Sequence, residues 1–358
     1  MFYQYLYPLH DYFQGFNVFK YITFRSFAAF MTAMLIYFIF GKPLIQYLRY
    51  KQLGQYIRGE GPEHHQIKKG TPTMGGVLIL IAALVSTLLW GNLTNGYTWL
   101  CMSVFAAFGL IGFVDDYKKQ IKKDNDGLQG RYKLLFQFLF AGLAAYFMIT
   151  ELGFDTHLYV PFIKRFHPDL GWFYILGVML VMVGASNAMN LTDGLDGLVA
   201  VPAITAFGTY GILAYVVGNA KIVEYLQLSP VLGAGEVSVF CAAVMGAVMG
   251  FLWYNAHPAE IFMGDVGSLA LGGALGLVAL ITKNELLLIV VAGIPVLETL
   301  SVIVQVISFK STGKRIFRMA PLHHHFELKG WAESKVIVRF WIISLILAIV
   351  SLATLKIR

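Results

Sequence analysis

Long runs of apolar residues recur along this chain and are separated by shorter polar segments. The runs are about 17 to 24 residues long, and a helix that crosses the hydrocarbon core of a membrane needs about 20 residues. The pattern therefore predicts an all-α, polytopic integral membrane protein, with residues 1–358 as a single transmembrane domain. Its ten transmembrane helices are expected near residues 19–40, 73–91, 97–113, 133–150, 172–189, 198–218, 237–254, 266–282, 286–309 and 337–355.

The composition agrees with this pattern and excludes several classes of protein. Hydrophobic residues make up 58% of the chain and charged residues 13%, against roughly 45–50% and 25% in soluble globular proteins. A soluble domain and a disordered chain are both excluded. The net charge of +7 does not indicate nucleic-acid binding, because Lys and Arg lie in the short segments between apolar runs. Cys101 and Cys241 lie inside apolar runs, which argues against disulfides or a thiolate metal site.

The basic residues indicate how the helices are oriented. Nineteen of the 27 Lys and Arg residues follow the first, third and ninth predicted spans. By the positive-inside rule these segments are cytoplasmic, and both termini lie outside. The first span has no early basic region and no small-residue cleavage site, so a retained helix is expected rather than a signal peptide. On the outer side, the sequence predicts a short hairpin within residues 151–171 and a short surface helix within 219–236.

Unusual polar residues gather at the predicted cytoplasmic ends of the spans. Four clusters lie at residues 109–116, 187–197, 255–268 and 321–327. The adjacent carboxylates of Asp115 and Asp116 repel each other and need a cation, a shared proton or bulk water. The same face also carries Asp193, Asp196 and Asp265. Such an all-oxygen set suits Mg²⁺ or Mn²⁺ better than zinc, whereas the simpler alternative is a group of solvated turns and helix caps.

Helical spacing relates several of these polar residues to one another. If the fifth span stays helical to its end, Asn187, Asn190 and Asp193 fall on one arc of about 120° and face one cleft. The alternative is that the asparagines only cap helices. In the next cluster, Asn255, Phe262 and Gly264 come before Asp265. The alternative there is a proline-broken turn in which Phe262 is a packing residue.

Three consecutive histidines, His323, His324 and His325, precede an acidic residue. Zinc binding is an open alternative, but adjacent side chains do not all point at one ion without contortion of the backbone. We expect that one or two of the imidazoles donate hydrogen bonds to an anionic substrate.

Lys68, Thr73 and Lys133 lie at the cytoplasmic starts of the second and fourth spans. The basic side chains of Lys68 and Lys133 are also explained by the positive-inside signal alone. Glu298 is unusual because it lies midway along the ninth span, three residues after Pro295. Two interpretations remain open for it, a buried structural hydrogen bond near a kink and a role in a cleft or relay.

Together these residues point to a class of reaction. Carboxylates that hold a metal, basic residues and turn glycines at a membrane surface are what metal-dependent phosphoryl transfer requires. The acceptor is then a lipid phosphate with its chain in the bilayer, and the donor is a water-soluble diphosphate. The active-site cleft is expected on the cytoplasmic face.

At these residues the sequence resembles the polyprenyl-phosphate N-acetylhexosamine-1-phosphate transferase superfamily. The resemblance covers essentially the whole length. Its motifs are GTPTMGG at residues 70–76, DD at 115–116, the segments 187–197 and 255–268, and APLHHHFE at 320–327.

The resemblance implies a homodimer in the bacterial cytoplasmic (inner) membrane, with both termini periplasmic. It implies transfer of phospho-MurNAc-pentapeptide from UDP-MurNAc-pentapeptide to undecaprenyl phosphate, with Mg²⁺ required and UMP released. That reaction forms the first lipid intermediate of peptidoglycan.

The resemblance also implies roles for individual residues. Asp265 is similar to the Mg²⁺ ligand, and Asp115, with Asp116 beside it, to the residue that deprotonates or orients the lipid phosphate. Contacts to uridine or diphosphate are implied for Asn190, Asp193, Asp196, Asn255, Phe262 and Gly264. The residues implied to line the same cleft are Lys68, Thr73, Lys133, Asn187, His323, His324 and His325.

Two rival functions are compatible with parts of the sequence. A sister transferase that acts on UDP-GlcNAc would carry similar motifs. A secondary transporter would also have ten spans and an intramembrane acid such as Glu298, although transporter sites lie near the midplane and these clusters lie at helix ends.

Overall fold

The computed structural model describes residues 1–51, 70–121, 127–160 and 166–356 of the chain. Its secondary structure is helical, and no strand occurs within these ranges. The α-helices are α1 (Phe2–Leu6), α2 (Ile22–Tyr50), α3 (Gly76–Trp90), α4 (Gly96–Ile121), α5 (Gly130–Thr150), α6 (Tyr174–Thr192), α7 (Ala200–Val217), α8 (Ala220–Leu226), α9 (Val237–Asn255), α10 (Gly264–Ile281), α11 (Leu288–Val291), α12 (Gly293–Thr312), α13 (Leu322–Glu327) and α14 (Glu333–Ala353). Short 3-10 helices include η1 (Tyr7–Asp11), η2 (Gln14–Lys20), η4 (Gly171–Phe173), η5 (Ala234–Glu236) and η6 (Thr354–Lys356).

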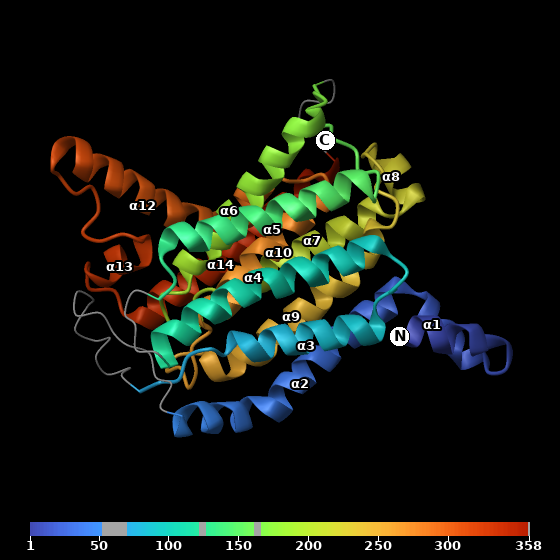
Figure 1. Ribbon diagram of the computed structural model, residues 1–358, viewed down its shortest axis with the longest axis horizontal. Coiled ribbons are helices and arrows are strands. Elements are labelled where there is room, and N and C mark those ends of the chain that lie inside the picture. The colour runs from blue at the N-terminus through green and yellow to red at the C-terminus, as the bar shows by residue number, and fades with distance from the viewer. Residues whose placement is uncertain (52–69, 122–126, 161–165, 357–358) are drawn as a thin grey trace.

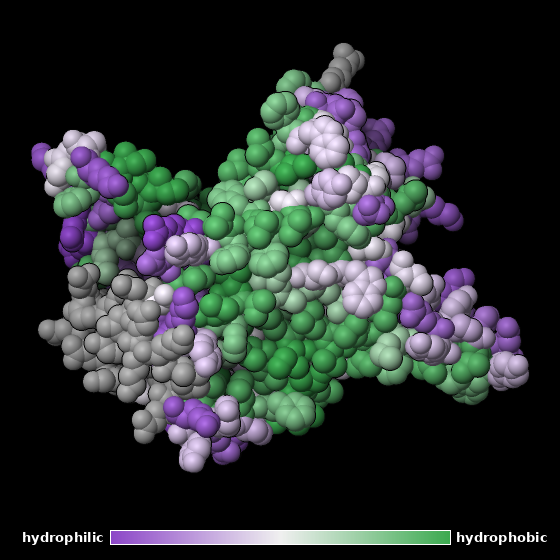
Figure 2. Space-filling model, viewed as in Figure 1, coloured by the Kyte–Doolittle hydropathy of each residue, from purple (hydrophilic) through white to green (hydrophobic). Residues whose placement is uncertain are grey.

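Nine helices of the described chain are long and apolar enough to cross a membrane. Together with the shorter apolar helix α3, they overlap all ten ranges predicted from the apolar runs. α3 has 15 residues and is therefore only about 22 Å long. Figure 2 shows apolar residues over the middle of the visible face and hydrophilic residues toward its edges, as expected for a multi-pass membrane protein.

α10 lies at the centre of the bundle and packs against α4 and α6, while α9 packs against α2 and α7. Apart from Gly264 and Asp265, every residue of α10 is buried. This helix is apolar around its whole circumference and rich in glycine and alanine, which let neighbouring backbones approach closely. The first turn of α10, which carries Asp265, is thereby held in a fixed place between its neighbours.

The helices alternate in direction, so several polar clusters meet at one end of the bundle. α4, α6 and α9 end there, and α5 and α10 begin there, at the left of Figure 1. We call this the acidic end, because Asp115, Asp116 and Asp265 lie there. The other end is called the opposite end.

The ninth predicted span, residues 286–309, is not one continuous helix. It is divided into α11 and α12, and Ala292 between them has φ −97° and ψ 33°. The proline ring of Pro295 conflicts with the carbonyl group four residues earlier, which is that of Val291, so the helix breaks there rather than bending at the proline. α12 then leans away from the bundle in Figure 1.

At the opposite end, the short helix expected within residues 219–236 is present as α8. Of the hairpin expected within residues 151–171, the described residues 151–160 and 166–171 show one antiparallel bridge between His157 and Asp169, flanked by backbone hydrogen bonds; residues 161–165 lie outside the described part of the chain. The short helices before α2 were not foreseen from the apolar pattern. A buried ion pair anchors the start of α2, since Arg25 donates to both carboxylate oxygens of Glu236 at 2.7 and 2.8 Å.

Candidate functional site

Two carboxylates and two lysines form the centre of the acidic end. The Lys119 ammonium donates to Asp115 Oδ2 at 2.8 Å and to Asp265 Oδ2 at 3.0 Å. The Lys133 ammonium donates to Asp265 Oδ2 at 2.8 Å and to Asp115 Oδ2 at 3.4 Å. Each lysine therefore bridges the same pair of carboxylates, and together they join α4, α5 and α10. We call these four residues, with Asp116, the acidic cluster.

Asp116 is directed at the first turn of α10. Its Oδ2 accepts the backbone N–H of Val266 at 3.1 Å, one of the donors that a helix N-terminus leaves without an intrahelical partner. Gly264, the first residue of α10, has φ 76°. A Cβ at this position would lie 3.0 Å from Thr73 Oγ1 and 2.5 Å from Asp116 Oδ2. Only glycine fits this conformation and this space, so Thr73, Asp116 and Gly264 converge on one point.

Asn190 and Asp193 reach the cluster from the end of α6. Asn190 Nδ2 donates to Asp265 Oδ1 at 2.7 Å and to Ser268 Oγ at 2.8 Å. Asp193 directly follows α6, and burial together with the nearby Asp265 carboxylate raises the pKa of Asp193 to about 7. The structure therefore brings Asn190 and Asp193 to the acidic cluster.

Asn187 lies one turn deeper and makes different contacts. Its Nδ2 donates to Gln137 Oε1 at 2.9 Å and to the carbonyl oxygen of Val183 at 2.8 Å. Both amide hydrogens are thus used within the bundle, away from the carboxylates. Asn187 thus lies on the same helix as Asn190, as predicted, but its amide group does not contact the acidic cluster.

Asp196 belongs to a second group. Its buried Oδ2 accepts the backbone N–H of Ala259 at 3.1 Å and lies 3.0 Å from Nδ1 of His257. The same imidazole nitrogen lies 3.8 Å from Glu333 Oε1. These three side chains have ligand atoms within 4.8 Å of one another, a spacing that would allow a metal ion.

The segment between α9 and α10 is held by backbone pairing and by Asn255. Asn255 Nδ2 donates to the carbonyl oxygen of Ile261 at 2.8 Å, while its buried Oδ1 has no hydrogen-bond partner among the described residues. Phe262 donates its N–H to the carbonyl oxygen of Pro72 and accepts from Gly75 N, both at 2.8 Å. The partly exposed Phe262 is therefore held beside the motif at residues 70–76, of which Thr73 is a member.

The three histidines each contact a different partner. His323 is buried, and its Nδ1 lies 3.3 Å from Glu298 Oε2. His324 Nδ1 lies 2.8 Å from Glu327 Oε2, and His325 Nδ1 accepts the backbone N–H of Arg318 at 3.1 Å. This divergence disfavours the alternative in which the triplet binds one zinc ion. Burial, Lys329 and Arg318 all lower the pKa of His325.

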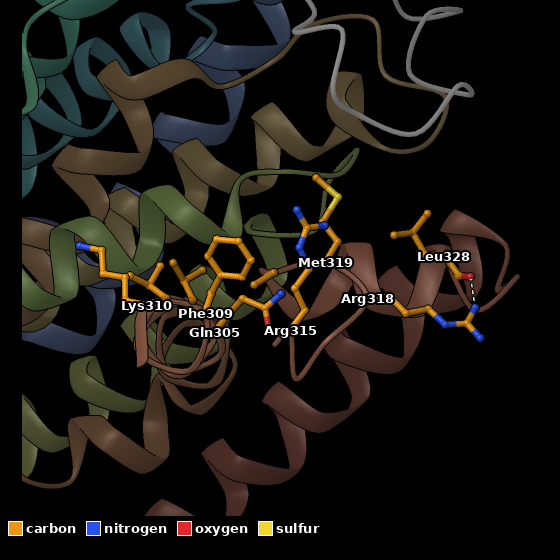
Figure 3. Close-up of a pocket in the computed structure, with 10 residues that line it drawn as sticks. Gln305, Phe309, Lys310, Arg315, Arg318, Met319 and Leu328 are labelled. Carbon is orange, nitrogen blue, oxygen red and sulfur yellow. Dashed lines mark hydrogen bonds between the residues drawn. The ribbon is translucent and has the colours of Figure 1, made fainter. Parts of the chain in front are cut away.

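A cavity of about 790 Å³ lies between α12 and the segment that leads to α13 (Figure 3). Its apolar walls include Val302, Val306, Phe309 and Met319, and its cations are Lys310, Arg315 and Arg318. Arg318 donates to the carbonyl oxygen of Leu328.

The sequence reasoning missed Lys119, His257, Glu333 and Gln137. Lys119 was assigned only to the orientation signal, although its place four residues after Asp115 on one helix predicts an ion pair. His257 was inside a motif, but nothing local indicates that Glu333, at the start of α14, meets it. Lys68 lies outside the described residues.

Comparison with known proteins gives a consistent result. Residues 97–283 match the model of glycosyl transferase family 4, and residues 68–80 match signature 1 of the phospho-N-acetylmuramoyl-pentapeptide-transferases. The chain is 56% identical over 358 residues to a protein of Pelobacter propionicus, 58% over 359 residues to one of Desulfosudis oleivorans, and 54% over 359 residues to one of Desulfotalea psychrophila. Each alignment covers 100% of both chains, and each relative is named phospho-N-acetylmuramoyl-pentapeptide-transferase.

Proposed function

Since the chain belongs to the phospho-N-acetylmuramoyl-pentapeptide-transferase family, we propose that it transfers phospho-MurNAc-pentapeptide from UDP-MurNAc-pentapeptide to undecaprenyl phosphate. The products are UMP and the first lipid intermediate of peptidoglycan synthesis. The observation that carries this proposal beyond family membership is the acidic cluster, in which Lys119 and Lys133 each bridge Asp115 and Asp265 at one end of the helix bundle.

The reaction exchanges one phosphorus–oxygen bond for another. An oxygen of the lipid phosphate attacks the phosphorus that carries the sugar. The bond from that phosphorus to the bridging oxygen breaks, and its electron pair stays on the oxygen that leaves with UMP. Because a lipid phosphate is already an anionic nucleophile, direct in-line attack needs no covalent enzyme intermediate.

In this proposal the carboxylates and the lysines of the acidic cluster have separate roles. Asp115 removes a proton from the lipid phosphate or orients it, and Asp116 fixes the first turn of α10 beside it. Lys119 and Lys133 offset negative charge as the two phosphate groups approach each other. Their hydrogen bonds to Asp265 hold both ammonium groups at the cluster before substrate binds.

The residues fit a divalent cation of the Mg²⁺ type. The carboxylate oxygens of Asp115 and Asp265 surround the same two ammonium groups. Hard oxygen ligands therefore already lie around positive charge at this position, as a Mg²⁺ site requires. We assign Asp265 as the Mg²⁺ ligand. When bound, the metal would neutralise diphosphate charge.

The remaining predicted residues are proposed to bind the donor. Asn190, Asp193, Thr73 and Gly264 surround the first turn of α10, where the diphosphate is expected. Phe262 would stack on the uracil ring. The other proposed contacts are Lys68, Lys133, Asn187, Asp196, Asn255, His323, His324 and His325.

The cavity beside α12 has the chemistry of an amphipathic lipid phosphate, because apolar walls and cations lie in one space. We assign it to the lipid acceptor. We further propose that the acidic end faces the cytoplasm of a bacterial inner membrane, that α3 completes ten spans with both termini periplasmic, and that the protein is a homodimer.

The direct test is UMP release by the purified protein supplied with UDP-MurNAc-pentapeptide, undecaprenyl phosphate and Mg²⁺. A parallel reaction with UDP-GlcNAc should give little product. EDTA should abolish turnover, and added Mg²⁺ should restore it. A folded protein that releases no UMP from UDP-MurNAc-pentapeptide would refute the proposed function.

A further inference from the structure

Glu298 is a carboxylate in the second turn of α12 with no contact to solvent. Its exposed fraction is 0%, and that of His323, the first residue of the histidine triplet, is 1%. Glu298 Oε1 accepts the backbone N–H of His323 at 3.2 Å, and Glu298 Oε2 lies 3.3 Å from His323 Nδ1. One carboxylate therefore binds the backbone of this histidine and lies beside its ring.

The contacts between Glu298 and His323 leave some of their polar atoms without a hydrogen bond. Glu298 Oε2 and both ring nitrogens of His323 have no hydrogen-bond partner among the described residues, because the 3.3 Å approach lacks the alignment of a hydrogen bond. A purely structural buried pair is expected to satisfy its polar atoms. The unused nitrogens indicate a group that is completed by something else.

The free nitrogen of His323 lies against the turn that follows α6. A Cβ added at Gly194 would overlap Nε2 of His323, so the absence of a side chain at Gly194 is what lets the imidazole approach this turn. Gly194 directly follows Asp193, which comes close to Gly264 and Asp265 at the start of α10. Nε2 therefore lies against the turn that begins with Asp193, one of the residues proposed to bind the donor.

We propose that Glu298 is a positioning residue for the transfer reaction and acts through His323. The carboxylate lies beside Nδ1, and Nε2–H donates to the phosphate of the leaving UMP once donor binding moves the turn at Gly194 off this nitrogen. This proposal rests on the function proposed above and adds a residue to it.

The chemistry requires no further reactant. When the bond to the bridging oxygen breaks, the electron pair stays with UMP, and negative charge grows on its phosphate. A hydrogen bond from Nε2–H becomes stronger as that charge develops.

The test is a double-mutant cycle with Glu298→Gln, His323→Asn and the double variant. Each single variant should lower kcat for UMP release at least about tenfold, with KM for both substrates within about threefold. The double variant should be no slower than His323→Asn, because Glu298 acts through that ring. Glu298→Asp keeps the carboxylate and should recover part of the rate.

Two further measurements separate positioning from folding. Glu285→Gln makes the same chemical change at a buried carboxylate near Tyr174, at the opposite end, and should leave kcat within about twofold. The thermal midpoint of each variant in detergent should stay close to that of the wild type. Multiplicative losses in the double variant, or wild-type kcat in Glu298→Gln, would overturn the proposal.

UMP binding keeps the two proposals distinguishable. The Kd for UMP, measured by titration calorimetry, should rise in both single variants and rise no further in the double variant. If the UMP Kd values of the wild type and the variants follow this pattern but the wild type forms no lipid product, the proposed reaction fails and the Glu298–His323 pairing stands. If UMP binding is unchanged in both single variants, the pairing has no role at the donor site and the inference fails.

Discussion

Lysines lie at both ends of the bundle, but their surroundings differ. At the opposite end, Lys283 is 6% exposed, and its ammonium lies 4.1 Å from the ring centroid of Phe154 and 4.8 Å from that of Tyr174. It also donates to the backbone carbonyl oxygens of Asp155 and His157. Its one carboxylate contact is Asp155 Oδ2 at 3.7 Å, as far as the described residues show. At the acidic end, Lys119 and Lys133 each contact two carboxylates, and Lys119 remains about one-third exposed.

This difference decides which of the charged groups can bind a substrate. Burial lowers the pKa of Lys283, and its rings and carbonyl groups leave little of the ammonium for another ligand. At the acidic end, the carboxylates of Asp115 and Asp265 each face two ammonium groups, and the acidic cluster reaches solvent through Lys119 and Asp265. The first arrangement holds a loop, and the second is suited to binding a cation and phosphate groups.

The largest expected effect comes from removing a carboxylate of the acidic cluster. Asp265→Asn and Asp115→Asn should each lower the rate of UMP release at least about a hundredfold, as expected for losing a metal ligand or a proton acceptor. Asp155→Asn at the opposite end is the matched control and should stay within about twofold of the wild type. Near wild-type rates for both cluster variants would contradict the assigned roles.

Removing a lysine of the cluster should have the next largest effect. Lys119→Met deletes two charge-assisted hydrogen bonds, each worth roughly 1.5–3 kcal/mol, so a loss of about tenfold or more in kcat is expected. Lys118→Met, on the neighbouring position of α4, provides the control. Equal kcat values for Lys119→Met and Lys118→Met would contradict a specific role for Lys119 in the acidic cluster.

The lysine of the opposite end should affect folding rather than catalysis. Lys283→Met should reduce stability by about 1–2 kcal/mol through lost cation–π and carbonyl contacts, measured as a lower thermal midpoint in detergent. The kcat of the folded fraction should remain within about twofold. A large fall in kcat at unchanged stability would remove the contrast between the two ends.

The smallest effect is expected in the cavity beside α12. A Lys310→Gln, Arg315→Gln double variant should raise KM for undecaprenyl phosphate about three- to tenfold with little change in kcat, because these cations attract the acceptor rather than the reacting atoms. Lys335→Gln, outside the cavity lining, is the control. An increase in KM for the UDP-linked donor alone would assign the cavity to the other substrate.

Much of the acidic end was predictable because helix length limits where polar residues lie. The apolar runs place Asp115, Asn190 and Asp265 at helix ends, and alternation of direction places those ends together. The Asp115–Lys119 pair is also predictable from local sequence, because residues four apart lie about one helical turn apart and face each other.

Other contacts depend on how each helix is rotated and which helix is its neighbour. Asn187 shares an arc with Asn190, yet its amide group meets Gln137 of α5. Glu333, at the start of α14, meets His257 near the end of α9. No spacing along the chain encodes these pairs, because they depend on the packing of separate helices.

The sequence alone determined that this protein has apolar helices with acidic and histidine-rich clusters at one end, because hydrophobic length and helical direction are local and additive properties. The tertiary structure decided which atoms meet. It placed Lys119 and Lys133 between Asp115 and Asp265, and it left Glu298 against His323 rather than in a solvent-facing cleft. Those contacts follow from close packing around α10 and from the break before α12, which only the assembled bundle specifies.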